Sequence, residues 1–100
     1  MKYNYRVLDI ATSEILEAAM WYEDNRQGLG DELINCFEAS LETILRNPLS
    51  FEKRHRDLRL TNIHRFPYQI IYYVKSYTVT VVAFNHGKSN PKFWKSRSKF

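Results

Sequence analysis

Two consecutive apolar segments constrain this chain more than any other feature of its sequence. Residues 68–74 (YQIIYYV) and 78–84 (TVTVVAF) are rich in β-branched and aromatic side chains, which are the residue types enriched in strands. Both segments are apolar at successive positions, a pattern typical of central strands that are covered on both faces, or on one face with a partner on the other. The three residues between them are few enough for a hairpin turn. We therefore expect two antiparallel strands at the centre of a sheet.

The first half of the chain supplies helices that can pack on such a sheet. Apolar residues recur at three- and four-residue steps over residues 33–45, and Asn47-Pro48 is expected to end this helix, because proline disfavours helical geometry in the residue before it. An earlier helix is expected to begin at Thr12 and Ser13, whose hydroxyls suit an N-cap. The GLGD sequence at 28–31 predicts a tight turn between the two helices. Together these elements predict a helical hairpin.

Three shorter segments complete the expected fold. Residues 3–9 alternate between apolar and polar positions, and residues 58–66 do so in part before Pro67, so both segments predict strands. Residues 91–97 predict a short terminal helix. The element order is β-α-α-β-β-β, followed by a short α. We therefore expect a single α+β domain over residues 1–100, with a small, mainly antiparallel sheet, an N-terminal strand and a helical hairpin packed on one face.

The charge of the chain is divided unevenly between its halves. Residues 1–50 carry four Lys and Arg against nine Asp and Glu, and residues 51–100 carry eleven against two, so the net charge of +4 joins an acidic half to a basic half. No apolar run approaches the roughly 18 residues that a membrane span requires. A lone cysteine, Cys36, excludes an internal disulfide and fits a reducing, cytoplasmic compartment. No sequence motif supports a metal, nucleotide or other cofactor site.

Four motifs in order carry a resemblance to a known family. They are WYEDNRQGLGDEL, LETILRNP, HRFPYQIIYYV and VVAFNHGKSNPKFW. The chain resembles the RelE/ParE toxin superfamily of bacterial type II toxin–antitoxin modules over about residues 7–97. The resemblance implies a cytoplasmic toxin that inhibits growth, as in plasmid stabilization, and that a cognate antitoxin neutralises.

Members of the superfamily differ in their targets. RelE-type members resemble metal-independent ribonucleases that cleave mRNA on the ribosome, whereas ParE-type members poison DNA gyrase. Where RelE-type enzymes have two arginines and a C-terminal tyrosine, this chain has Gln69, Ser89 and, near the tyrosine's place, Trp94 and Lys95. The resemblance therefore favours ParE-like inhibition of DNA gyrase. A RelE-like mRNA endoribonuclease and a degenerate, non-toxic module that only binds its antitoxin are the alternatives, so whether the chain is an enzyme stays open.

The candidate site residues lie mainly in the basic half. For RNA cleavage, His86 is the candidate base and Lys88 the candidate cation for the phosphate, although His86 is equally suited to a hydrogen bond in the turn at Gly87. Contact with a nucleic acid or a protein target is assigned to six further residues. They are Arg59, Arg65, Lys92, Trp94, Lys95 and Arg97.

Some of these assignments carry a competing structural interpretation. Trp94 is expected to pack on the sheet in preference to stacking on a base, and His64 is expected on the strand face opposite Arg65. Trp21 is expected in the core. The basic run at 53–56 is expected in a loop, as a docking or solvated patch.

A partner is expected from the charge pattern as well as from the resemblance. A two-sided apolar sheet with a basic rim suits an acidic, amphipathic segment that folds on binding. We expect the cognate antitoxin to cover a surface near Arg59, Arg65 and residues 91–97. A homodimer and a toxin–antitoxin hetero-oligomer both remain open.

Overall fold

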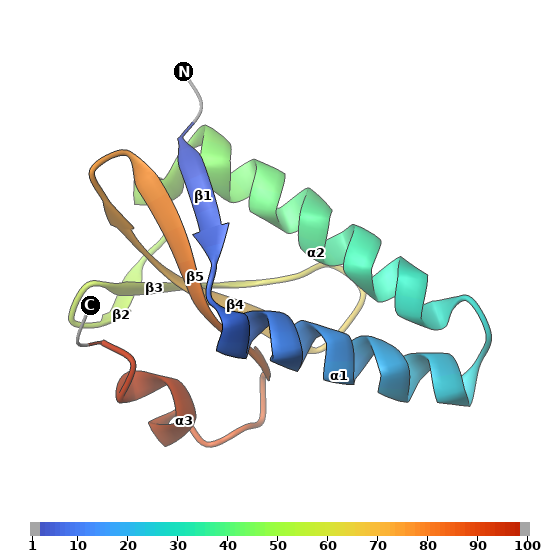
Figure 1. The fold of residues 1–100 in the computed structure, drawn as a ribbon. Coiled ribbons are helices and arrows are strands. Elements are labelled where there is room, and N and C mark those ends of the chain that lie inside the picture. Colours follow the sequence, from blue (N-terminus) through green and yellow to red (C-terminus); the bar gives the residue numbers. More distant parts are fainter. Residues whose placement is uncertain (1–2, 99–100) are drawn as a thin grey trace.

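The two apolar segments form the centre of a five-stranded sheet. The computed structural model describes residues 3–98, and in it the segments are antiparallel strands β4 (Tyr68–Lys75) and β5 (Thr78–His86). Strand β3 pairs with β4 and β2 pairs with β3, both antiparallel, while β1 lies parallel to β5 at the other edge (Figure 1). These three strands are β1 (Asn4–Val7), β2 (Lys53–His55) and β3 (Leu58–Asn62). The sheet order is therefore β1-β5-β4-β3-β2.

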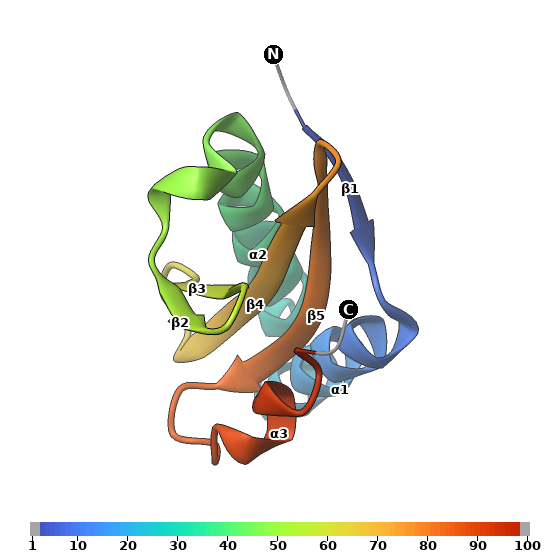
Figure 2. The same ribbon diagram turned by 90° about the vertical axis from the view of Figure 1, so that its left-hand side faces the viewer.

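Two long helices cover one face of this sheet. Helices α1 (Asp9–Asn25) and α2 (Leu29–Arg46) form the expected hairpin, and a 3-10 turn (Pro48–Ser50) follows α2. A short helix, α3 (Lys92–Lys95), lies on the other side of the sheet (Figure 2). The expected α+β class, with an N-terminal strand and a helical hairpin on one face, is confirmed.

The central strands are apolar at successive positions because each contributes to two clusters. Alternate side chains of β4 point to opposite faces, so Ile70 and Tyr72 pack under the helices with Leu33 and Ile44. Ile71 points the other way, into a second, smaller cluster that also contains Leu58, Val82 and Trp94. Burial of both sets offsets the conformational entropy lost when the hairpin of strands is ordered.

Two glycines make the connection between α1 and α2. Gly28 has φ 89°, a left-handed conformation that a residue with a Cβ adopts only with strain. Its N–H and that of Gly30 both donate to the carboxylate of Glu23, at 3.0–3.1 Å, so a side chain of α1 satisfies the first N–H groups of α2. A tight turn between the helices is confirmed, but it comprises residues 26–28, and the remaining residues of the predicted turn, 29–31, belong to α2.

The start of α1 differs from the prediction. The helix begins at Asp9 and is preceded by Leu8, so Thr12 and Ser13 lie inside the helix and the predicted N-cap there is wrong. The Leu8 N–H donates to the Val81 carbonyl of β5, which holds Leu8 in extended geometry. The Thr12 N–H already donates to the Leu8 carbonyl. The chain therefore turns from the sheet directly into the helix.

The segment around β2 and β3 also differs. The basic run expected in a loop includes β2, and β3 ends at Asn62 instead of continuing to residue 66. The Ile63 N–H donates to the Tyr68 carbonyl and closes a turn in which Arg65 has φ 71°. The predicted strand that placed His64 and Arg65 on opposite faces is therefore wrong. Pro67 lies within this turn, where its missing N–H breaks no ladder hydrogen bond.

A buried tyrosine connects the sheet to the turn after α2, and it gives a first prediction. The Tyr72 hydroxyl donates to the Pro48 carbonyl at 2.7 Å, and the residue is fully buried. Replacing Tyr72 by Phe is expected to lower the free energy of unfolding by about 1–2 kcal/mol, because the Pro48 carbonyl is left buried without its donor. Urea denaturation measures the loss, and Tyr77→Phe, at an exposed position, is the control.

The same variant predicts a pH dependence. Burial raises the pKa of Tyr72 from 10.0 to about 12, against an opposing effect of Arg59. Because the folded chain favours the protonated hydroxyl, its contribution to stability is complete below pH 10 and is lost as the pH rises through about 12. The difference in stability between wild type and Tyr72→Phe is therefore expected to shrink over this interval. An unchanged difference would contradict the assignment.

Candidate functional site at the end of β5

His86 ends β5 and begins the turn into the loop before α3. Its Nδ1 accepts a hydrogen bond from the Lys88 N–H at 3.0 Å, and its ring contacts the edge of Tyr68. This is the turn contact that was one of its two expected roles. A neutral imidazole whose Nδ1 accepts carries its hydrogen on Nε2. In this arrangement the Nε2–H of His86 is a hydrogen-bond donor for an incoming group. The lone pair of Nδ1 already accepts the Lys88 N–H.

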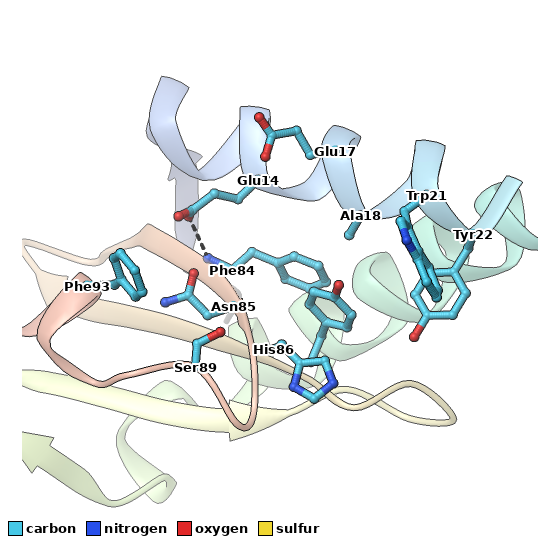
Figure 3. Close-up of a pocket in the computed structure, with 11 residues that line it drawn as sticks. Glu14, Glu17, Ala18, Trp21, Tyr22, Phe84, Asn85, His86, Ser89 and Phe93 are labelled. Atoms are coloured by element: carbon cyan, nitrogen blue, oxygen red, sulfur yellow. Dashed lines mark hydrogen bonds between the residues drawn. The ribbon is translucent and has the colours of Figure 1, made fainter. Parts of the chain in front are cut away.

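Beside His86 lies an open groove between α1 and the end of β5. The groove has a volume of about 580 Å³. Figure 3 shows Trp21 and Glu17 on its α1 side, with Phe93 at its far end in this view and His86 below. Trp21 and Phe93 are 60% and 63% exposed. Aromatic faces at the surface of a groove are suited to stacking on, or packing against, a partner.

Trp21 was expected in the core, and this expectation is wrong. Consecutive residues of a helix point about 100° apart, and of Trp21 and Tyr22 only Tyr22 faces the sheet. Tyr22 takes the inner position, where its ring contacts Phe66 and Tyr68. The sequence signal that was missed is the adjacency of the two aromatic residues on one helix.

Arg97 closes this region by an ion pair with Glu14 of α1. The two guanidinium nitrogens lie 3.0 and 3.1 Å from the two carboxylate oxygens of Glu14, and Nη1 also donates to the Val82 carbonyl at 2.7 Å. Glu14 accepts from the Phe84 N–H as well, at 3.0 Å (Figure 3). With its amide oriented so that the nitrogen faces acceptors, Asn85 donates to the same carboxylate. Arg97 thus holds the C-terminal segment against α1 and β5.

The other candidates in the C-terminal segment divide into buried and exposed residues. Trp94 is only 5% exposed and packs in the second cluster, which agrees with the packing expected for it. Lys92 and Lys95 lie on either side of it on α3 and are exposed, as is Lys88 in the preceding loop. The exposed cations near His86 are therefore lysines.

Arg59 and Arg65 lie away from this segment. Arg59 donates to the carbonyl oxygens of Leu49, at 3.3 Å, and Phe51. It is paired in register with Tyr72, whose side chain lies under the helices, whereas Trp94 packs on the opposite face. Arg65 forms an ion pair with Glu32 of α2 at 2.8 Å. The candidates Arg59, Arg65 and residues 91–97 do not share one face of the sheet.

Residues 3–98 hold no group of three or more His, Cys, Asp or Glu side chains arranged to bind a metal ion. Within the same residues, no helix combines the length and the apolar character needed to cross a membrane.

Comparison with known proteins identifies relatives by sequence and by fold. A family model described as the ParE toxin of the type II toxin–antitoxin system parDE matches residues 5–91. A structure of the chromosomal ParDE system from P. aeruginosa is similar with a TM-score of 0.76 at 8% identity, covering 85% of this chain and 96% of that one. The RelBE2 toxin–antitoxin complex from Mycobacterium tuberculosis is similar with a TM-score of 0.62 at 17% identity, covering 86% and 99%. No curated protein matches the chain.

Proposed function

Because the chain belongs to the ParE toxin family of type II toxin–antitoxin systems, we propose that it inhibits bacterial growth by binding DNA gyrase and does not cut RNA. One observation carries this choice. The three arginines among the candidate residues are all engaged within the chain: Arg59 with backbone carbonyls, Arg65 with Glu32 and Arg97 with Glu14. Metal-independent RNA cleavage requires cations that are positioned around the reacting phosphate. The arginines that could serve this purpose already have other partners.

The region around His86 supports the same choice. RNA cleavage also needs a base for the 2′-hydroxyl, and the lone pair of His86 Nδ1 is used by the Lys88 N–H. The Gln69 side chain lies beside the Gly87 turn, at a position where the resemblance to RelE-type enzymes leads one to expect an arginine. A neutral amide there adds no charge that could stabilise a phosphorane. We therefore assign the exposed lysines Lys88, Lys92 and Lys95 to contact with a protein target.

Two assays run in parallel test the proposal. The purified protein is added to DNA gyrase, with supercoiling of relaxed plasmid as the readout, and to translating ribosomes, with cleavage of the mRNA as the readout. We expect supercoiling to be inhibited in proportion to the protein added and the mRNA to stay intact. A heat-unfolded sample of the same protein is the control for nonspecific inhibition.

If the mRNA is cleaved, variants at His86 and Lys88 show whether this chain is responsible for the cleavage. If the wild-type protein cleaves mRNA and both His86→Ala and Lys88→Ala abolish the cleavage, the chain is a ribonuclease and the proposal is wrong. Cleavage that persists in both variants identifies a contaminating nuclease. If the protein affects neither assay, and its expression without an antitoxin does not arrest bacterial growth, the degenerate antitoxin-binding module replaces the toxin.

We also propose an acidic antitoxin as the neutralising partner. The exposed lysines Lys88, Lys92 and Lys95 offer a basic surface to such a partner. Helix α1 offers an apolar surface, since Leu16, Met20 and Trp21 are all more than half exposed. Exposed apolar side chains gathered on one helix are typical of a surface that a partner covers. An antitoxin segment that reaches both Arg59 and residues 91–97 has to pass from one face of the sheet to the other, because these residues lie on opposite faces.

A further inference from the structure

A polar patch lies on the sheet at the end opposite His86. Strands β4 and β5 pair Tyr68 with His86 at one end and Lys75 with Thr78 at the other. At the latter end, Arg6 of β1 is in register with Thr80 of β5, and Thr80 is in register with Tyr73 of β4. Residues in register on neighbouring strands point to the same face. We call Arg6, Tyr73, Lys75 and Thr80 the Arg6 patch.

The Arg6 patch faces away from the helical hairpin. The Tyr73 ring packs in the second cluster, which lies on the face opposite α1 and α2. Lys75 follows Tyr73 by two residues on β4 and therefore points to the same face. Helix α3 contributes Trp94 to the second cluster, and its chain follows the end of β5, away from the Lys75–Thr78 pair (Figure 2). Within the patch, Arg6 and Lys75 are exposed, whereas Thr80 and Tyr73 are buried beneath them.

Two hydrogen bonds fix the orientation of the Arg6 guanidinium. Its Nε donates to Thr80 Oγ1 at 3.2 Å, and its Nη2 donates to the Tyr73 hydroxyl at 3.4 Å. A guanidinium carries five N–H groups, so several donors remain for a ligand. The side chain is exposed, so these donors are accessible from solvent. Arg6 is thus held in one orientation by neutral hydroxyls and keeps its full charge.

The cations of the Arg6 patch lack a carboxylate partner among the described residues, as do the exposed lysines near His86, whereas five other cations have one. Arg26, Lys53, Arg54, Arg65 and Arg97 each lie within 4.0 Å of an Asp or Glu oxygen. Over residues 3–98, neither Arg6 nor Lys75 forms such an ion pair. The positive charge of the patch is therefore not neutralised by a neighbour there, and it is available to an anion.

The pKa of Tyr73 agrees with a positive potential at this place. Burial alone would raise it, but hydrogen bonds with Arg6 and Thr80 and the charges of Arg6 and Lys75 bring the pKa below its ordinary value of 10.0. A lowered pKa means that the folded chain favours an anionic oxygen at the position of this hydroxyl. The same surroundings favour the anionic oxygen of a ligand.

We propose that the Arg6 patch binds a phosphate group of a nucleic-acid backbone. A fixed guanidinium and an ammonium group, both exposed, offer donors to the tetrahedral oxygens of a phosphodiester. The basic half of the chain favours a polyanion over a single small anion. The patch is distinct from the His86 region, at the other end of β4 and β5, and the proposal does not depend on which enzyme the toxin inhibits.

Binding of a fluorescent single-stranded oligodeoxynucleotide to the full-length protein, followed by anisotropy over a range of salt concentrations, tests this proposal. We expect Lys75→Gln and Arg6→Gln each to weaken binding about fivefold and to lower the salt dependence by about one released counterion. The matched control is Lys53→Gln, which removes the same charge from an exposed lysine that is paired with Asp57. The control is expected to change the affinity by less than twofold.

A second measurement does not depend on the stability of the variants. We expect the oligonucleotide to raise the pKa of Tyr73 in the wild-type protein, because a bound anion disfavours the phenolate. The ring signals of Tyr73 in NMR spectra report this pKa.

The proposal is overturned if Lys53→Gln weakens binding as much as Lys75→Gln, or if the oligonucleotide leaves the pKa of Tyr73 unchanged. Competition identifies other ligands: an effect from inorganic phosphate alone indicates a free oxyanion, and stronger competition by polyglutamate indicates an acidic protein. Either result overturns the assignment to nucleic acid.

Discussion

Replacing Gly30 by alanine is expected to lower the free energy of unfolding by about 2 kcal/mol, although alanine is the better helix former. A Cβ at this position would lie 2.6 Å from the carbonyl oxygen of Ala19 and 3.1 Å from Oε1 of Glu23. Helix propensity favours the alanine by up to about 1 kcal/mol. Overpacking against a backbone atom typically costs about 1–3 kcal/mol and occasionally more. The clash outweighs the propensity, because the Ala19 carbonyl moves only if α1 and α2 separate.

The Glu23 carboxylate increases the loss of stability expected for Gly30→Ala. It accepts the N–H groups of Gly28 and Gly30, so a methyl group that displaces it also weakens the capping of α2. Replacing Glu23 by Gln in the Gly30→Ala background is therefore expected to cost less than in the wild type, because the two changes disturb one contact. Equal costs in both backgrounds would mean that the methyl group acts on Ala19 alone.

Urea unfolding of Gly30→Ala and of a matched alanine variant measures the difference. The matched variant is Gly87→Ala, where a Cβ would meet no atom closer than the Pro67 carbonyl oxygen at 3.7 Å. This control is expected to keep the wild-type stability within about 0.5 kcal/mol. If Gly30→Ala is as stable as Gly87→Ala, the two helices can separate at no cost and the close contact does not hold the hairpin.

The predictable part of the fold rests on continuous hydrophobic patterns. Residues 68–74 and 78–84 were recognised as central strands because their continuous, largely apolar positions, 70–73 and 79–84, are buried on one face or the other. Helix α2 was recognised because its buried residues, from Leu33 to Leu45, follow one helical stripe. In these elements a local pattern and the tertiary packing demand the same structure, so the pattern is sufficient.

Elements without such a pattern were missed. Strand β2 consists of Lys53, Arg54 and His55 and becomes a strand only because the edge of β3 pairs with it. The start of α1 depends on a hydrogen bond from the Leu8 N–H to the Val81 carbonyl. The two residues are far apart in the sequence, and neither their side chains nor their neighbours carry a signal for a backbone contact. The limits of β2 and α1 are therefore set by backbone hydrogen bonds that form only when the sheet is assembled.

The same distinction applies to the site. His86 and the exposed lysines were found from the sequence because they form part of a continuous motif near the end of the apolar segment. Arg97 was grouped with them by sequence, but its partner Glu14 is 83 residues away. Only the folded position of the C-terminal segment, in which Arg97 contacts the Val82 carbonyl as well as Glu14, brings the two together. Likewise, Arg6 and Tyr73 are joined by strand register, which no local pattern of the sequence specifies.

The ion pair of Glu14 and Arg97 gives the prediction with the largest expected effect. Replacing Glu14 by Gln is expected to lower the free energy of unfolding by about 3 kcal/mol, since breaking a buried pair leaves one charge without its partner. The Arg97 side chain is only 14% exposed and the Glu14 side chain 22%, so water replaces the lost carboxylate poorly. A glutamine also offers one acceptor oxygen where the carboxylate accepts from Phe84 and from both terminal nitrogens of Arg97.

The loss is expected to appear first in the C-terminal segment. Arg97 lies two residues after the end of α3, and its contacts to Glu14 and the Val82 carbonyl hold Trp94 against the sheet. In a Trp21→Phe background, Trp94 is the remaining tryptophan, so its fluorescence reports this segment alone. We expect Glu14→Gln to shift this emission to the red at urea concentrations below the main unfolding transition.

Glu17 provides the matched control, because it lies one turn further along α1 and lines the groove, and over residues 3–98 it forms no ion pair. Glu17→Gln removes the same charge and is expected to change the free energy of unfolding by less than about 0.5 kcal/mol. The double variant Glu14→Gln/Arg97→Gln is expected to be more stable than the sum of the two single losses predicts, because no charge is left unpaired. Strictly additive losses would contradict a direct ion pair. If Glu14→Gln and Glu17→Gln lower the free energy of unfolding equally, the loss comes from the changed net charge of α1 and not from the ion pair. The C-terminal segment would then be held by the packing of Trp94.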